Sequence, residues 1–354
     1  MPAGAVMPAS VSVVGAGIAA ATAAHCLTNR GIAVARGAPP VALCNGAPAV
    51  MLGEQAQILL RDVFAGDASL VHELDVAHRI ARRIVRWGND DAHVLPHSAL
   101  VIAGDRLGAA LPWGNDGKGT PRFALSTVAP PTSTLLRFGQ REASATPVVL
   151  QPGADPHAAL VEAITHGWLF LIPTGAHGGT QRGWLLVVGA QIDESLEESR
   201  LVASAIAETG GVSKRFETAP RILDAFAMSD TLALGTLTLG SSAVAFDPIC
   251  GDGVATAVRG GILAAAVAAE MIADTGLDRA ALTGHYRAML IAAMRRHLAV
   301  SSLFYQRGGQ GPWWREQAEA LAHGHVWCTR QLAAVGDAQF VLVGDRITLR
   351  DRVV

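Results

Sequence analysis

The chain is poor in charged residues and in cysteine, and these shortages exclude several classes of protein. Only 16% of its 354 residues are charged and 50% are hydrophobic, so a large core is available and disorder is not expected. The formal net charge of -2 gives no basic footprint, and we expect no nucleic-acid partner. The 4 cysteines are scattered without a CxxC pair, which is typical of reduced thiols in the cytoplasm.

Membrane and metal signals are also missing from the sequence. The apolar N-terminus has no basic residue before Arg30, and glycines interrupt it, so it does not have the pattern of a signal peptide. The alanine-rich run at 262–273 is too short to cross a bilayer. No Cys/His cluster has metal-ligand spacing. We therefore expect a cytoplasmic protein with no membrane contact and no metal site.

A glycine turn near the N-terminus predicts a dinucleotide-binding unit. The segment SVSVVGAGIAAATAAHCLTNRGIAVAR has the order strand, tight turn, helix, strand, which is the context that a GxGxxG motif requires. Gly15 permits the turn, Gly17 lets a pyrophosphate approach the backbone, and Ala20 occupies the third glycine position. The helix N-terminus offers free N–H groups to an anion. The expected elements are a strand at 11–14, a helix at 18–29 and a strand at 32–36.

One polar anchor of such a unit is missing. Dinucleotide folds normally carry an acidic residue at the end of the second strand, where it holds the adenosine ribose. Here Arg36 follows Ala35 and precedes Gly37, with no carboxylate nearby in the sequence. Adenosine is therefore held differently, weakly or not at all.

A second glycine loop, DPICGDG at 247–253, leads into a long small-residue helix expected from Val254 to about residue 273. Two glycine-loop helix starts suit the two ends of one extended cofactor. One end would hold a pyrophosphate, and the other a flavin ring, whose reduced form carries negative charge that a helix N-terminus stabilises. Two unrelated helix caps are the alternative interpretation.

The remaining elements follow from hydrophobic periodicity and from glycine or proline stops. Trp168 and Phe170 alternate before Pro173, which places both rings on one face of a strand. The other predicted elements are helices at 53–64, 76–87 and 196–209, buried strands at 184–190 and 232–239, and a region of strands and loops at 104–157.

Taken in order, these motifs resemble flavin-dependent monooxygenases of the tryptophan-halogenase-like group. GAGIAA resembles the FAD pyrophosphate turn, Gly53-Glu54 the pair that lines the flavin cleft, and FDPICGDGV the flavin-ring loop. LFYQRGGQGPWWREQ resembles the C-terminal aromatic region of the group, and WLFLIP resembles the halogenase WxWxIP motif with Phe170 in place of the second tryptophan. In that family the aromatic motif stands beside the flavin.

The resemblance implies a mixed α/β (α+β) chain with a Rossmann-like FAD-binding fold of the glutathione-reductase type, an inserted antiparallel substrate sheet and a helical C-terminus. It implies three regions: a discontinuous FAD-binding region at 1–90 and 185–275, a substrate-side sheet and cleft wall at 91–184, and a helical region at 276–354.

The resemblance also implies roles for single residues. Trp168 and Phe170 would wall the flavin cleft, and Arg86 would lie on the substrate side. Cys250 in the ring loop is a packing residue or a thiol activated by the helix N-terminus. The candidate catalytic set is therefore Trp168, Phe170, Arg86 and Cys250. The candidate cofactor-binding residues are Gly15, Gly17, Ala20, Arg36, Gly53, Glu54, Ser241, Asp247, Pro248, Gly251, Asp252, Gly253 and Val254.

Two departures from the group bear on the reaction and on the cofactor. Halogenases need a lysine, but the chain has only Lys118 and Lys214, neither in a matching context, and Arg86 stands where halogenases have lysine. Because arginine stays protonated and cannot copy a lysine amine, halogenation is disfavoured. Relatives also have Gly-Asp where this chain has Gly240-Ser241, and a lost charge-assisted hydrogen bond costs on the order of 1.5–3 kcal/mol.

The segment Arg86-Trp87-Gly88 instead resembles the flavoproteins that hydroxylate a peptidyl tryptophan during maturation of tryptophylquinone enzymes. We therefore expect an FAD-dependent monooxygenase that hydroxylates an electron-rich aromatic ring, with a tryptophan of a partner protein as one candidate substrate. FAD would be reduced by NAD(P)H or by a separate flavin reductase. The alternatives are a small-molecule hydroxylase or halogenase of natural-product biosynthesis, and a non-catalytic binding or maturation partner.

Overall fold

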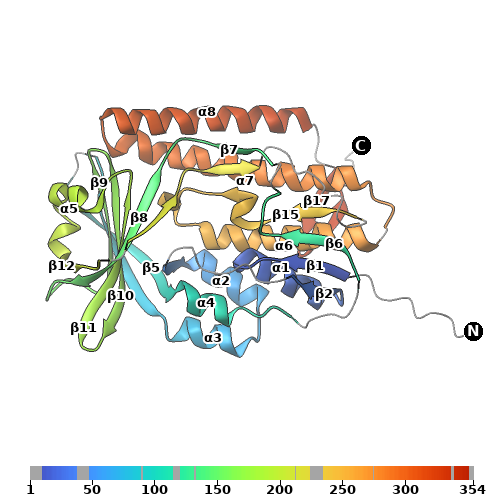
Figure 1. Ribbon diagram of the computed structural model, residues 1–354, viewed down its shortest axis with the longest axis horizontal. Helices are drawn as coiled ribbons and strands as arrows, with labels where there is room; N and C mark the ends of the chain where they lie inside the picture. The colour runs from blue at the N-terminus through green and yellow to red at the C-terminus, as the bar shows by residue number, and fades with distance from the viewer. Residues whose placement is uncertain are drawn as a thin grey trace, which may run out of the picture.

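Two large sheets and a stack of helices form most of the molecule, together with a small three-stranded sheet and a two-stranded one (Figure 1). The computed structural model describes residues 10–37, 48–88, 91–114, 120–130, 133–211, 213–223, 234–273, 275–335 and 339–350. The smaller sheet is parallel, with the strand order β15-β6-β1-β2. Its strands are β1 (Ser10–Val14), β2 (Ala33–Arg36), β6 (Pro121–Ser126) and β15 (Thr236–Thr238).

The larger sheet has nine strands in the order β12-β8-β11-β10-β9-β4-β5-β3, with β13 also paired to β8. All of its described pairings are antiparallel except that of β4 with β9. Its strands are β3 (Ala49–Gly53), β4 (His78–Arg86), β5 (His93–Ala103), β8 (Glu142–Leu150), β9 (Ala158–Ile164), β10 (Gly167–His177), β11 (Thr180–Val188), β12 (Ile206–Thr209) and β13 (Lys214–Glu217).

The helices pack between and beside these sheets, and α7 and α8 form a long pair along the top of the view in Figure 1. They are α1 (Ile18–Asn29), α2 (Glu54–Val63), α3 (Ala68–Asp75), α4 (Gly104–Ala110), α5 (Ile192–Glu198), α6 (Gly253–Ala273), α7 (Arg279–Gly308) and α8 (Pro312–Val335). The short elements are η1 (Ala203–Ala205), η2 (Gly240–Ser242), η3 (Pro248–Cys250), β7 (Leu135–Arg137), β14 (Arg221–Leu223), β16 (Val244–Ala245), β17 (Phe340–Val343) and β18 (Arg346–Leu349). The predicted fold class, a parallel nucleotide-type sheet with an antiparallel sheet and a helical C-terminus, is confirmed.

Helix α6 packs against α1 with almost no space between the two backbones. A Cβ atom on Gly261 would lie 2.6 Å from the carbonyl oxygen of Ala19 and 2.7 Å from Cβ of Thr22. Among the described residues α6 is the one helix long and apolar enough to span a membrane, but 67% of its apolar window is buried inside the fold. Its hydrophobicity is therefore accounted for by its place in the core.

Two predicted helices are wrong. Residues 78–86 form β4, because β5 and β9 pair with it on both sides and this tertiary pairing overrides the helical spacing of its arginines. The predicted helix at 196–209 does not form as one element: α5 ends at Glu198 and the chain becomes strand β12 at Ile206. Its backbone N–H groups after Ser199 bind the Glu162 carboxylate instead of continuing the helix.

Three other predicted elements differ less from those in the structure. The strand predicted at 184–190 begins earlier, at Thr180. Within 232–239 the described strand is Thr236–Thr238, and residues 232–233 lie outside the described residues. The region at 104–157 begins with a helix, α4, before its strands.

The three predicted regions do not separate the two large sheets, because each sheet takes strands from more than one region. β6 lies in the range 91–184 yet pairs with β1 in the parallel sheet. β12 and β13 lie in the range 185–275 yet pair with β8 in the nine-stranded sheet. The division at 1–90, 91–184, 185–275 and 276–354 stays a prediction of domain organisation, with these exchanges of strands.

The contact of α6 with α1 leads to a first prediction. Gly261→Ala should lower the free energy of unfolding by roughly 1–3 kcal/mol, because its methyl group overpacks a backbone contact. The neighbouring Gly260→Ala is the control, since its Cβ would have nothing within 4 Å and alanine favours the helix by about 1 kcal/mol. Urea unfolding of both variants measures the difference, and equal stabilities would contradict the close packing.

Candidate functional site

The first glycine turn presents an open helix N-terminus. Gly15 and Gly17 have φ angles of 103° and 96°, which side chains rarely adopt. A Cβ on Gly15 would collide with Oγ1 of Thr127, which accepts a hydrogen bond from the Ala16 N–H at 3.1 Å. A Cβ on Gly17 would meet nothing within 4 Å, and Gly17 provides no side-chain cap for α1. The turn therefore leaves space beside the start of α1, although neither glycine lines the cavity described below.

The second turn comes near the first through the close contact of α6 with the first turns of α1. The crossing at Gly261 is eight residues after Gly253, which at 1.5 Å per residue is about 12 Å along α6. Gly240, which precedes the second turn in the chain, also lies against the first helix: a Cβ on it would lie 3.4 Å from the Cβ of Ala19. The two turns therefore border one region of the molecule, as an extended ligand requires.

A cavity of about 660 Å³ occupies this region beside the second turn. Strands β3, β10 and β11 form one wall, the segment after β15 forms another, and α6 and α7 close the far side. Six predicted cofactor-binding residues line it: Ser241, Asp247, Pro248, Gly251, Gly253 and Val254. Gly251 and Gly253 would each accept a Cβ without contact, so the backbone of this loop is open to a ligand.

The two aromatic residues of β10, Trp168 and Phe170, have different surroundings. Phe170 lines the cavity together with Ile172 and Leu186. Trp168 is 1% exposed and lies in the core, where its Nε1 donates to the hydroxyl of Tyr305 at 3.2 Å. Both rings lie on one face of the strand, as predicted, but only Phe170 borders the cavity.

A buried ion pair fixes the ring loop from outside the cavity. Arg141 Nε lies 2.9 Å from Oδ2 of Asp247, and both side chains are fully buried. The Tyr305 hydroxyl donates to the same carboxylate at 2.8 Å, and Asp247 Oδ1 accepts from the Ile249 N–H. Burial raises the pKa of the Asp247 carboxyl, while Arg141 and these hydrogen bonds oppose the rise. Removing one partner of such a pair leaves an uncompensated buried charge.

His297 of α7 holds the same loop through its backbone. Its Nε2 accepts from the Asp247 N–H at 2.9 Å, and its ring stacks on Phe246 with centroids 4.4 Å apart. Burial, with Arg141 nearby, lowers the pKa of His297 to about 3. The imidazole is therefore neutral at physiological pH, with its proton on Nδ1 because Nε2 is the acceptor.

Cys250 points away from the cavity. Its Sγ lies 3.4 Å from Oγ of Ser301, which is in turn 3.2 Å from Nε2 of His297. Burial raises the pKa of the Cys250 thiol to about 12, so the thiol stays protonated. A protonated thiol is a poor nucleophile, and this geometry favours the packing role over the reactive one.

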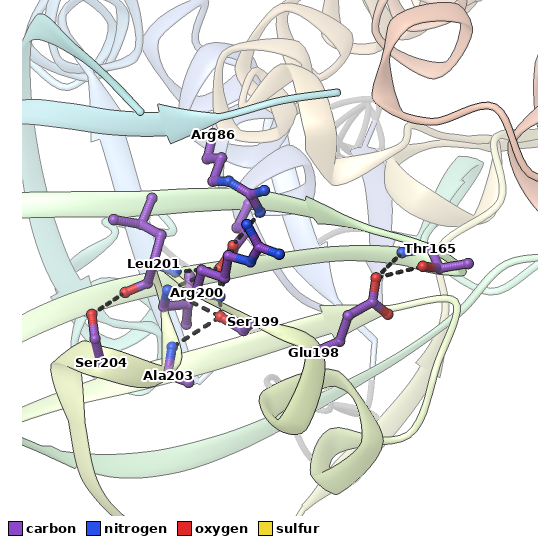
Figure 2. A network of polar contacts seen from close by, with 10 residues as sticks. Arg86, Thr165, Glu198, Ser199, Arg200, Leu201, Ala203 and Ser204 are labelled. Atoms are coloured by element: carbon purple, nitrogen blue, oxygen red, sulfur yellow. Dashed lines mark hydrogen bonds and ion pairs between the residues drawn. The ribbon is translucent and has the colours of Figure 1, made fainter. Parts of the chain in front are cut away.

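Arg86 lies on the opposite face of the large sheet from Phe170. It stands in register with Glu162 on β9, and its Nη1 lies 2.9 Å from Oε1 of that buried carboxylate. Figure 2 shows Arg86 above the loop at 199–203, whose Ser199 hydroxyl and backbone N–H groups also converge on Glu162. Burial would raise the pKa of Glu162, but these hydrogen bonds lower it. Arg86 thus stabilises a loop, and the prediction that it lies on the substrate side of the cleft is not met by this geometry.

The cation on the cavity face of β4 is Arg83. Its guanidinium carbon lies 5.9 Å from the Phe170 ring centroid, and its Nη2 lies 3.2 Å from Nε2 of His97. Burial lowers the pKa of Arg83. The sequence did not indicate this contact, because residues 76–87 were expected to form a helix and the strand that orients Arg83 was not recognised.

The remaining predicted residues, Gly15 and Gly17 among them, do not line the cavity. Arg36 ends β2, donates to the Gly114 carbonyl at 3.2 Å and lies 5.3 Å from the Trp113 ring centroid. Gly53 ends β3, and Glu54 is exposed at the start of α2. Ala20 is fully buried in the α1 contact with the core. Asp252 lies between two cavity-lining glycines, and burial raises the pKa of its carboxyl.

No metal cluster accompanies this site within the part of the chain that the structure describes: no group of three His, Cys, Asp or Glu side chains could hold an ion there.

Solved structures share this fold, although no protein-family model and no curated protein sequence matches the chain. The peptidyl tryptophan dihydroxylase QhpG, essential for tryptophylquinone cofactor biogenesis, matches with a TM-score of 0.68 and 17% identity over 97% of this chain and 86% of that one. The flavin-dependent halogenase CmlS matches with a TM-score of 0.70 and 13% identity over 96% and 75%. The myxobacterial chondrochloren halogenase CndH matches with a TM-score of 0.67 and 12% identity over 96% and 99%. The chain therefore has the fold of these flavin-dependent enzymes.

The neutral His297 gives the second prediction. Its folded pKa of about 3 lies below the ordinary value of 6.5, so the unfolded chain binds more protons between these pH values. The stability linked to this group is complete above about pH 6.5 and is lost as the pH falls. In His297→Gln the free energy of unfolding should therefore decrease less steeply from pH 6.5 to 4, by up to about 1.4 kcal/mol per pH unit. Urea unfolding across this range measures it, with exposed His323→Gln as control; parallel slopes would contradict the assignment.

Proposed function

We propose that the chain binds FAD across its two glycine turns and acts as a flavin-dependent monooxygenase on an electron-rich aromatic ring. The observation that carries this proposal is the close contact of α1 with α6 beside a cavity that the second glycine turn lines. The residues present fit the cofactor: a Cβ on Gly17, Gly251 or Gly253 would meet nothing within 4 Å, so both turns leave space beside the backbone for an anion and a flavin ring. The shared fold with flavin-dependent enzymes supports the same assignment.

Each part of the site has a role in this proposal. The N-terminus of α1, with Gly15, Gly17 and Ala20 in the turn, holds the pyrophosphate. The loop at 247–254 and the N-terminus of α6 hold the ring and stabilise its negative charge. Bound FAD supplies the oxygen-activating chemistry, and NAD(P)H or a separate reductase supplies its electrons. Phe170, Ile172 and Leu186 exclude water from the reacting face.

We favour hydroxylation over halogenation because the cation against the Phe170 wall of the cavity is an arginine and not a lysine. Lys214 lies on β13 at the distant edge of the large sheet, and Lys118 lies outside the described residues. The cation that contacts the Phe170 wall is Arg83, and a guanidinium stays protonated and cannot replace a lysine amine. A tryptophan in a partner protein is the proposed substrate, as QhpG acts on a peptidyl tryptophan. We propose a cytoplasmic location.

FAD binding is the first test of this function. Purified protein should show the absorbance of oxidised flavin, or gain it on titration with FAD. Gly253→Glu should weaken FAD binding at least tenfold, because a carboxylate would fill the ring-loop cradle and repel the anion. The fold should tolerate it, since a Cβ there meets nothing within 4 Å and an acidic first turn stabilises a helix.

Gly253→Ala is the matched control and should retain most of the FAD affinity. A wild-type protein that ignores FAD would support the non-catalytic alternative, a binding or maturation partner.

The substrate needs a separate test. Reduced FAD, oxygen and a tryptophan-containing peptide should give a peptide that has gained one oxygen atom, detected by mass spectrometry. Free tryptophan and free indole are run in parallel. Turnover of the free compounds with no turnover of any peptide would favour a small-molecule hydroxylase, and a halogenated product in bromide would contradict the proposed reaction.

A further inference from the structure

The cavity extends away from the ring loop along a groove between α6 and α7. Helix α7 returns beside α6 in Figure 1, and both helices contribute lining residues over eleven positions, from Gly253 to Leu263 and from Tyr286 to Arg296. Ten helical residues span about 15 Å. Most of these residues belong to none of the motifs that point to the cofactor, so those motifs do not explain why the groove is there.

Small and apolar side chains form the body of the α6–α7 groove. Ala257, Gly260 and Ala293 keep its floor low, and a Cβ on Gly260 would meet nothing within 4 Å. Leu342 of β17 and the ring of Tyr286 border the end away from the ring loop. The Tyr286 hydroxyl is turned aside, since it donates to the Thr238 carbonyl at 3.0 Å.

Positive charge lies at the ring-loop end of the groove on α7 and near the middle of the lining stretch on α6. Arg259 of α6 and Arg296 of α7 both line the cavity and are exposed. Neither has a hydrogen bond or ion pair in the described part of the chain, although both attract the Asp252 carboxylate. These three charges sum to +1. Asp247 does not add to the sum, because Arg141 neutralises it.

We propose that this groove binds an amphiphilic carboxylate, with its anionic end between Arg259 and Arg296 and its alkyl chain directed toward Leu342. Charge complementarity selects the anion, and the apolar, side-chain-poor floor selects an unbranched hydrocarbon chain. The groove is continuous with the cavity beside the ring loop, but the proposal does not depend on the chemistry proposed there.

Isothermal titration calorimetry with decanoate tests the proposal. The wild-type chain should bind decanoate saturably, and 1-decanol at least tenfold more weakly because it lacks the charge. Gly260→Leu should weaken decanoate binding at least tenfold by filling the groove floor. The double variant Arg259→Gln/Arg296→Gln should do the same while leaving 1-decanol binding unchanged.

Arg295→Gln is the matched control, because Arg295 neighbours Arg296 on α7 and is exposed but does not line the groove. Its decanoate affinity should equal that of the wild type. The proposal is overturned if the wild type does not bind decanoate, or if both the Gly260 and the arginine variants bind it normally. It is also overturned if the arginine double variant loses FAD affinity and not decanoate affinity, which would assign these cations to the cofactor.

Discussion

The close contact between α1 and α6 is the constraint on which the rest of the site depends. Gly261 has no side chain, and any Cβ there would enter the backbone of α1 at Ala19. The contact lies at the second residue of α1 and about 12 Å from the start of α6, and it brings the two N-termini to the same region. Each N-terminus offers backbone N–H groups and a helix dipole to a ligand, which no single turn could provide. The apolar surface of α6 serves the same contact, since most of it is buried.

The second turn keeps its shape through groups that lie far away in the sequence. Arg141 comes from the start of the β8 segment, and His297 and Tyr305 come from α7, yet all three meet at Asp247. A loop rich in glycine loses much entropy on ordering, so such a loop needs external anchors if it is to present a fixed surface to a ligand. The anchors bind Asp247 from the side away from the cavity, and the loop backbone therefore stays free on its inner side.

Local signals in the sequence were enough to predict the elements that carry the two turns. The helix expected at 18–29 agrees with α1 residue for residue, because a strand, a glycine turn and a small-residue helix are adjacent in the chain. The helix expected at 76–87 is wrong, because its strand character comes from β5 and β9, and the side chain directions of Arg83 and Arg86 follow from that pairing. Arg141 carried no local signal. Tyr305 lay in the aromatic segment that was recognised, but its bond to Asp247 could only be known from the fold.

The missing carboxylates at Arg36 and Ser241 have a definite consequence for how an anionic nucleotide is held. Two absent charge-assisted hydrogen bonds weaken binding by about 3–6 kcal/mol, or roughly 10² to 10⁴ in affinity. The interactions that remain are backbone N–H groups and helix dipoles, which recognise charge and shape but do not clamp a ribose. In the proposed binding mode, with Arg36 placed over the Trp113 ring, the adenosine end is the less constrained end of the site. A site of this kind suits a flavin that arrives already reduced and leaves after use, because fast exchange requires modest affinity. The same lack of anchors that weakens retention of FAD is therefore compatible with the proposed delivery by a separate reductase.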